Sequence, residues 1–463
     1  MVVKKITGAL LGIIAFICIS FFIPTSEVWT AEALRAIGIL VCAIFWILFS
    51  VLPDFVCALG MIAVYIITKT VTVGVALAPF SASTVWMLIC ALGLGAAASK
   101  SGLLTRISLI LMRRLSPTYV GQCLALIVSG VIVSPLIPST GAKSTIVAPL
   151  ALSTANTLGV QPHSKPAAGV FLSFYTGYIS AANGFLSASF ISYTLIGLMP
   201  EGKEITWMNW FTYGLVFLIV SVVLMALVII FYYGPKEKIE VPKEKIIQQL
   251  KDLGPWTRKE KIALTVLVCC LVLWMFERVL NIPSFAVALV GMLVMISFDI
   301  MDYKDFRTTL PWENIFFVGA FLCVASIFTN LKIDAAIAAT IGNSLDSVLK
   351  NPYLLVFSWC ILTFVLRTFI VSNSTCVVLM TLILMPLCPQ YGIHPFILIF
   401  VGYAAANIWT LIYQNSPTIM SLAAQRHELV VHNEVASGSL WYMAICIVAC
   451  LASVPIWQMM GLL

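Results

Sequence analysis

Unbroken apolar runs near the ~20-residue length that a helix needs to cross a bilayer recur along the whole chain. Ile6–Ile23 and Phe211–Tyr233 are two of them. A membrane β-barrel would instead alternate polar and apolar positions. Of the 463 residues, 61% are hydrophobic and only 10% are charged, a balance foreign to soluble domains. The chain is therefore predicted to be an all-α polytopic membrane protein.

Polar breaks divide the chain into about eleven predicted transmembrane helices and two interrupted segments. The spans are expected near 6–23, 33–50, 54–73, 82–112, 167–199, 208–233, 261–277, 283–300, 313–341, 394–424 and 439–461. The segments 118–157 and 353–388 are apolar but are cut by Pro, Gly, Ser and Asn. Each fits a re-entrant hairpin that enters and leaves on one side of the membrane.

The charges predict how the chain is divided and oriented. Basic residues favour the cytoplasmic side, so Lys4 and Lys5 place the N-terminus inside and the C-terminus outside a cell membrane. The first hairpin then opens to the cytoplasm and the second to the exterior. The predicted units are an N-terminal span (1–30), a first repeat (31–233), a cytoplasmic linker (234–260) and a second repeat (261–463).

Landmarks recur across the linker at nearly one offset. Ser139 and Ser372 lie 233 positions apart, and Asn183 and Asn415 lie 232 apart. Because an odd number of spans separates the two repeats, they are expected to be inverted, with a binding site between them near the middle of the membrane.

Two short polar motifs are the candidate site. They are Ser139-Thr140-Gly141 in the first hairpin and Ser372-Asn373-Ser374-Thr375 in the second. Their side chains favour helix N-caps, and a helix that begins there presents free N–H groups and a positive dipole end. Two such tips facing each other can bind the two ends of a dicarboxylate. The alternative is that these Ser and Thr residues only pack between helices.

Each hairpin contains a single charged residue, Lys143 in the first and Arg367 in the second. A lysine at membrane depth costs roughly 2.5–3.5 kcal/mol, so Lys143 needs a partner or a water-filled site. It is predicted to attract a carboxylate or to replace a coupling cation; the alternative is snorkelling to the cytoplasmic edge. Arg367 is expected to snorkel at the mouth of its hairpin.

The span after each motif contains a further polar break. Asn183 marks the first break, and Asn415-Ser416-Pro417 mark the second. Carbonyls freed there are hard ligands suited to Na⁺, so Ser372, Asn373 and Asn415 are candidate sodium ligands, with a plain proline kink as the alternative.

Several functional classes are disfavoured. The 19 Asp and Glu residues fall in loops or at span edges, which argues against a cation/proton antiporter. No phosphate-binding Gly-rich loop and no nucleophile–base set appear in the sequence, so neither a nucleotide-driven pump nor an enzyme is expected. The 13 Cys show no metal-binding spacing and are expected to be packing residues. No cofactor and no nucleic-acid partner is predicted. The predicted partners are the lipid bilayer and a small di- or tricarboxylate anion.

These motifs resemble the divalent anion/sodium symporter (DASS) family of di- and tricarboxylate transporters and plastid 2-oxoglutarate/malate translocators. The residues that carry the resemblance are Trp86, Ser101-Gly102-Leu103, Pro138-Ser139-Thr140-Gly141-Ala142-Lys143, Trp312, Ser372-Asn373-Ser374-Thr375 and Tyr413-Gln414-Asn415-Ser416-Pro417. The resemblance implies inverted repeats, facing hairpin tips, a homodimer and an elevator motion of the hairpin-bearing domain.

The first motif departs from the family pattern, because Thr140-Gly141 replaces Asn-Thr. Lys143 falls at the position where the motif of exchanger-type members has an arginine. This departure favours sodium-independent exchange, whereas Asn373 keeps sodium open at the second motif. The interpretation is a secondary transporter of malate, succinate, 2-oxoglutarate or citrate that leans to exchange. Sodium-coupled symport of a dicarboxylate or sulfate, a cation/proton antiporter and a passive anion channel are the alternatives.

Overall fold

The computed structural model describes residues 2–200, 202–239, 243–341 and 345–463, and the elements that these residues form are all helices. Eight helices in this part of the chain are long and apolar enough to cross a membrane. Four shorter apolar helices accompany them. The prediction of an all-α, multi-pass membrane protein is therefore confirmed.

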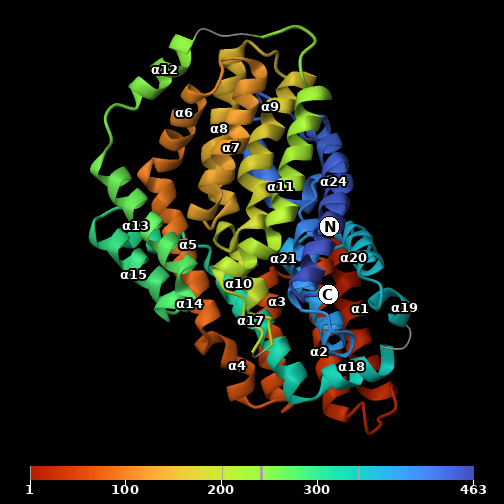
Figure 1. The fold of residues 1–463 in the computed structure, drawn as a ribbon. Coiled ribbons are helices and arrows are strands. Elements are labelled where there is room, and N and C mark those ends of the chain that lie inside the picture. The colour runs from red at the N-terminus through yellow and green to blue at the C-terminus, as the bar shows by residue number, and fades with distance from the viewer. Residues whose placement is uncertain (1, 201, 240–242, 342–344) are drawn as a thin grey trace.

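The helices of the first half extend from the N-terminus to the linker (Figure 1). They are α1 (Val2–Ile17), α2 (Ala31–Leu48), α3 (Asp54–Ile67), α4 (Val73–Ser81), α5 (Ser83–Ser101), α6 (Leu103–Arg114), α7 (Tyr119–Val133), α8 (Thr140–Leu158), α9 (Lys165–Tyr175), α10 (Phe190–Ile196) and α11 (Trp207–Phe231). Short helical turns Thr176–Ser180, Ala181–Gly184 and Leu186–Ala188 interrupt the path from α9 to α10.

The second half repeats much of this order. Its helices are α12 (Lys243–Asp252), α13 (Arg258–Met275), α14 (Glu277–Leu280), α15 (Ser284–Ser297), α16 (Tyr303–Thr308), α17 (Trp312–Asn330), α18 (Ile333–Ile341), α19 (Asp346–Leu349), α20 (Pro352–Arg367), α21 (Asn373–Leu384), α22 (Phe396–Ala406), α23 (Ser416–Ala424) and α24 (His432–Met459). Helices α7 and α20 begin 233 positions apart, and so do α8 and α21. The inversion of one half relative to the other stays a prediction.

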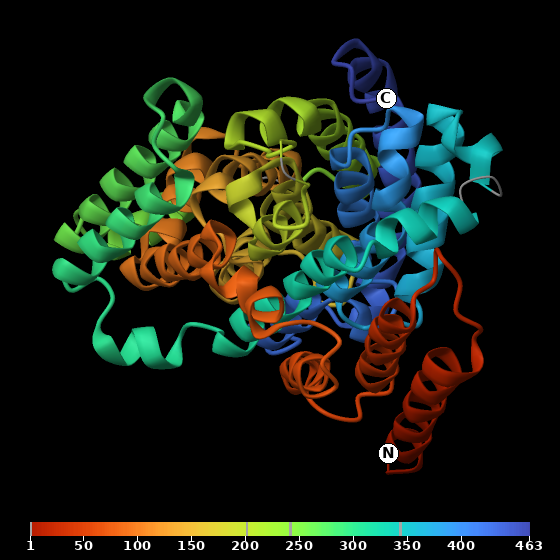
Figure 2. The ribbon, with the colours of Figure 1, turned by 90° about the horizontal axis from the view of Figure 1, so that it is seen from below.

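We call α7–α8 hairpin 1 and α20–α21 hairpin 2. In Figure 1, α7, α8, α9 and α11 form the upper part of the molecule, and α4, α17 and α18 lie at the opposite end. Seen from below, the N-terminal helix α1 stands at the rim of the molecule (Figure 2), where little of its surface is buried. The broken helices contain the best-buried helices, α9 and α22, whereas α20 of hairpin 2 exposes one face.

Two spans that were predicted without an internal break are each two helices. The span predicted at 82–112 is α5 and α6, because Gly102 between them has φ +83°. This left-handed conformation ends a helix and suits glycine. The span predicted at 313–341 is α17 and α18, separated where Lys332 has φ +54°. A single glycine or lysine in an apolar run did not indicate these breaks.

A buried ion pair fastens the end of the linker to the first half. Arg106 Nε donates to Glu260 Oε1 at 2.7 Å, and each side chain is at most 5% exposed. The guanidinium also donates to the carbonyls of residues 253–255. Helix α12 lies against α6. Residues 240–242 of the predicted linker 234–260 lie outside the described residues.

Replacing Arg106 with leucine should lower the free energy of unfolding by about 3–5 kcal/mol, because it leaves the Glu260 carboxylate buried without its partner. Thermal unfolding of the purified protein in detergent measures this. Lys100→Ala is the matched control: Lys100 pairs with Asp302 and Asp305 at the surface, where ion pairs contribute about 0–1 kcal/mol. Equal melting temperatures for the two variants would contradict the prediction.

Candidate anion-binding cavity

Both predicted polar motifs line one cavity of about 730 Å³. Its wall contains the tip of hairpin 1, the tip of hairpin 2 and the break between α22 and α23. The predicted site residues that line it are Ser139, Thr140, Gly141, Ser372, Asn373, Ser374, Asn415, Ser416 and Pro417. The structure therefore brings together residues that lie more than 230 positions apart in the sequence.

Each hairpin tip begins a helix in the cavity wall. Ser139 Oγ accepts a hydrogen bond from Ala142 N at 3.1 Å and caps α8. Ser372 Oγ accepts from Thr375 N at 3.3 Å and caps α21. The caps satisfy one donor each, which leaves the other first-turn N–H groups and the positive dipole end of each helix beside the cavity.

The third part of the wall is the break between α22 and α23. Asn415 caps α23, with Oδ1 accepting from Thr418 N at 3.4 Å and Nδ2 donating to Asn407 Oδ1 at 2.9 Å. Pro417 stands in the first turn of α23, where a missing N–H costs nothing. The break thus exposes main chain and small polar groups to the cavity.

Lys143 does not line the cavity. Its side chain is fully buried, and Nζ donates to the carbonyl of Ala188 at 2.9 Å and to Ser134 Oγ at 3.4 Å. None of the ion pairs among the described residues includes it. The ammonium therefore joins hairpin 1 to the broken helix α9–α10. It neither contacts the cavity directly nor snorkels to the membrane edge.

Arg367 is also fully buried, so the expectation that it snorkels is wrong. Its guanidinium donates to the carbonyls of Ala406 (2.9 Å), Val371 (2.7 Å), Ile370 and Gln414. The first and last of these oxygens belong to the break between α22 and α23. Because the break supplies carbonyls that no helix satisfies, the guanidinium finds its partners inside the protein and needs no water.

The two hairpins hold their cations on opposite arms. Ser134 and Arg367 lie 233 positions apart, and so do Lys143 and Cys376. Hairpin 1 therefore has its cation, Lys143, on the second arm, and it has Ser134 at the position equivalent to Arg367. Hairpin 2 has its cation, Arg367, on the first arm, and it has Cys376 at the position equivalent to Lys143. Each hairpin has one buried cation, and each cation bonds carbonyls of the broken helix in its own half.

Two other predicted site residues lie behind the wall. Asn183 is fully buried: Nδ2 donates to Tyr442 Oη at 3.1 Å, and its main-chain carbonyl accepts from Trp210 Nε1 at 3.0 Å. Thr375 is buried against the Ser372 hydroxyl at 2.8 Å. Ser189, rather than Asn183, caps the resumed helix α10 and lines the cavity. The offset of 232 that matched Asn183 to Asn415 therefore does not relate the two helix caps, Ser189 and Asn415.

Sequence reasoning did not assign several other cavity residues to the site. Asp54, Asn314 and Gln414 line the cavity beside the tips. Asp54 and Asn314 stand at the starts of α3 and α17, and helix starts cannot be assigned to a shared cavity without the fold. Asn373 Oδ1 has no hydrogen-bond partner among the described residues and is an acceptor available at the tip of hairpin 2.

Comparison with known proteins gives a family match and a fold match. The family model described as the sodium:sulfate symporter transmembrane region matches residues 4–463. Bacillus subtilis YflS, provisionally named a malate transporter, is 26% identical over 74% of this chain and 72% of its own length. Spinach chloroplast dicarboxylate transporter 2 is 24% identical over 74% of this chain, which spans 63% of that protein.

Two solved structures share the fold across nearly the whole chain. The Alcanivorax borkumensis YdaH transporter superposes with a TM-score of 0.59 at 14% identity, covering 99% of this chain and 98% of its own. Neisseria gonorrhoeae MtrF gives 0.53 at 14% identity, covering 98% and 94%. Identity this low shows a common fold alone.

Replacing Arg367 with alanine should destabilise the protein by about 3 kcal/mol or more, because orphaned buried acceptors cost ~1–3 kcal/mol each. Arg367→Lys should recover only part of this loss, since one ammonium cannot replace the planar guanidinium. Thermal unfolding in detergent measures the effect. Arg278→Ala, which removes an exposed arginine from α14, is the matched control. If Arg367→Ala melts like the control, the carbonyl contacts are not stabilising.

Proposed function

This chain belongs to the family of the sodium:sulfate symporter transmembrane region, and we propose that it is a secondary transporter of small dicarboxylates that works by anion exchange. The observation that carries the proposal is that the capped N-termini of α8 and α21, at the tips of the two hairpins, line one shared cavity. Its Bacillus and spinach relatives are named for malate and dicarboxylate transport, which supports the same class of substrate.

The cavity suits an anion with two separated carboxylates. Each helix N-terminus carries roughly half a positive charge and several free N–H donors. The hydroxyls of Ser139, Thr140 and Ser374 add neutral hydrogen-bond partners. Malate, succinate, 2-oxoglutarate and citrate are the candidate substrates. Sulfate, which has a single charged centre, makes less use of two tips.

The buried cations support exchange without sodium. The carbonyls freed at the break between α22 and α23 were expected to be sodium ligands, but Arg367 bonds two of them, Ala406 and Gln414. Lys143 bonds the carbonyl of Ala188, beside the cap of α10. In each half a fixed positive charge stands next to the break. A loaded anion can then cross without recruiting a mobile cation.

Sodium-coupled symport is the second candidate, and one observation favours it. Asn373 Oδ1 has no hydrogen-bond partner among the described residues, and Ser372 and Asn415 line the same cavity. These three oxygen donors are the hard ligands that Na⁺ prefers. Sodium at hairpin 2 is therefore the specific alternative to test.

For the transport step we propose an elevator motion of two inverted repeats, with a homodimer as the working unit. Hairpins 1 and 2, the two broken helices, α11 and α24 would move as one body, because α11 and α24 pack on each other and on these elements. Lys4 and Lys5 support a cytoplasmic N-terminus in the cell membrane and an exterior C-terminus.

The first test is uptake of labelled succinate, and in parallel citrate, by proteoliposomes. Vesicles loaded with unlabelled dicarboxylate should take up label at the same rate in sodium and in choline buffers, and empty vesicles should take up little. Uptake into empty vesicles driven by a sodium gradient would overturn exchange in favour of symport. Transport of sulfate alone would overturn the dicarboxylate assignment.

Replacing Lys143 with alanine should lower exchange by about tenfold or more, equivalent to about 1.4 kcal/mol. The substitution removes a positive charge beside the cavity and leaves the Ala188 carbonyl without this donor. Added sodium should restore part of the activity of Lys143→Ala but leave the parent unchanged. Absence of any sodium effect on a correctly inserted Lys143→Ala protein would contradict the cation-replacement role.

Charge position gives a matched double variant. Ser134→Arg combined with Lys143→Cys gives hairpin 1 the residue pair that hairpin 2 has at the equivalent positions. It should exchange succinate faster than Lys143→Cys alone, because the cation returns on the opposite arm. Equal rates for the two variants would contradict this prediction, because a positive charge on the first arm would then not replace one on the second arm.

A further inference from the structure

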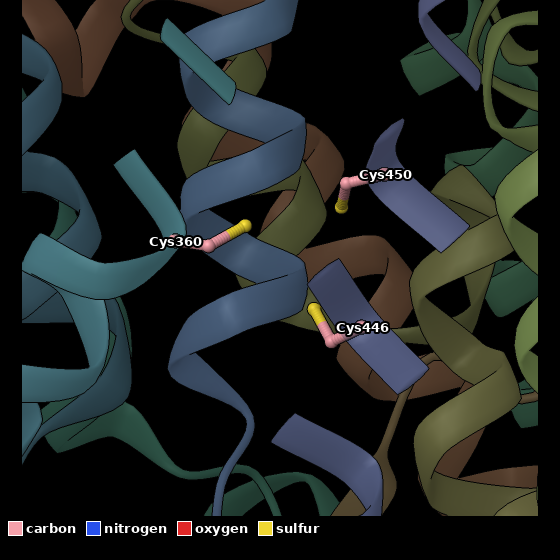
Figure 3. Close-up of side chains that lie close together, drawn as sticks. All are labelled: Cys360, Cys446 and Cys450. Atoms are coloured by element: carbon pink, nitrogen blue, oxygen red, sulfur yellow. The ribbon is translucent and has the colours of Figure 1, made fainter. Parts of the chain in front are cut away.

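Three cysteines from two helices converge outside the cavity. Cys360 lies on α20, and Cys446 and Cys450 lie one helical turn apart on α24. Their sulfur atoms all lie within 4.8 Å of one another, and the three residues are fully buried. Figure 3 shows the three side chains pointing into a common space between the helices. None of them lines the anion cavity.

The convergence follows from helical spacing. Residues four apart share one face of a helix, so Cys446 and Cys450 present two thiols to the same neighbour. Helix α20 packs against that face and contributes the third. In the described part of the chain, no other group of three or more His, Cys, Asp or Glu places its ligand atoms this close together. Three soft ligands therefore form a preassembled set.

The surroundings restrict what this set can bind. No Asp, Glu, Lys or Arg lies between Lys350 and Arg367 on α20 or after Glu434 on α24. A complex with net charge is costly at such a depth. Three thiolates around Cu(I) carry a net charge of minus two. Around Zn(II) they carry minus one, and they leave the fourth tetrahedral position empty. A trivalent thiophilic centre makes a neutral complex with all three.

We propose that Cys360, Cys446 and Cys450 form a binding site for trivalent arsenic, taken up as arsenous acid. The reaction exchanges ligands without oxidation or reduction: three As–OH bonds break, three As–S bonds form, and each thiol proton leaves with a hydroxide as water. Both the arsenous acid that enters and the tris-thiolate complex that forms are neutral, so the reaction leaves no net charge in the apolar interior. The bound arsenic joins the first arm of hairpin 2 to α24.

The test measures arsenic bound to the purified, reduced full-length chain after incubation with arsenite and desalting. The parent should retain about one arsenic per chain more than Cys360→Ala, because the three As–S bonds need all three thiols. X-ray absorption should show sulfur alone around this arsenic. The parent should also melt at a higher temperature with arsenite than without it.

Matched variants make the result specific. Cys446→Ala and Cys450→Ala should lose the same arsenic as Cys360→Ala, so the test does not depend on one variant folding. Cys388→Ala removes an equally buried thiol from another place and should keep it. Arsenic retained equally by Cys360→Ala and the parent, or coordinated by oxygen, would overturn the site. Binding of Cu(I) or Zn(II) without arsenic would overturn the charge argument.

Discussion

The fold depends on pairing the buried cation of each hairpin with main-chain oxygen atoms of a broken helix. A carbonyl left without a donor in hydrocarbon costs several kcal/mol, and so does an unpaired ammonium or guanidinium. Arg367 satisfies carbonyls at both ends of the α22–α23 break, and Lys143 satisfies Ala188 at the α9–α10 break. Neither the cation nor the broken helix is stable at this depth without the other. The same bonds fix each hairpin to the broken helix of its own half.

This pairing explains why the two hairpin tips present main chain and small hydroxyls to the cavity. The cations keep the tips in place from behind, so no long side chain has to cross the cavity. Ser139 and Ser372 can then start their helices at the wall, with first-turn N–H groups left for an anion. Asn415 does the same for α23. Three helix starts around one space would form a preorganised site for the proposed anion, because their donors would need no rearrangement when it enters.

Local signals predicted the parts of the site that depend on local structure. Ser139, Ser372 and Asn415 precede apolar runs and cap helices, which is a property of a few neighbouring residues. Two of the four carbonyl partners of Arg367 lie 39 and 47 positions further along the chain, so its neighbours in the sequence do not by themselves indicate its burial. Asn183 matched Asn415 by offset, yet the first broken helix contains additional turns and resumes at Ser189. The insertion shifts the cap by six positions, and only the folded backbone reveals it.

Placing the positive charges behind the tips also has a consequence for release of the anion. A lysine or arginine in direct contact with a carboxylate forms a short, charge-assisted bond, roughly twice as strong as a neutral one. A transporter must let go of its substrate on both sides of the membrane, so such a bond slows the cycle. Lys143 and Arg367 instead donate their hydrogen bonds to carbonyls and act on the cavity only through their electric field. That field weakens with distance but is screened little in a low-dielectric interior. At the two hairpin tips the proposed substrate then meets neutral donors, with a positive potential from behind them. Binding of this kind favours dianions over neutral molecules while keeping each contact weak enough to break.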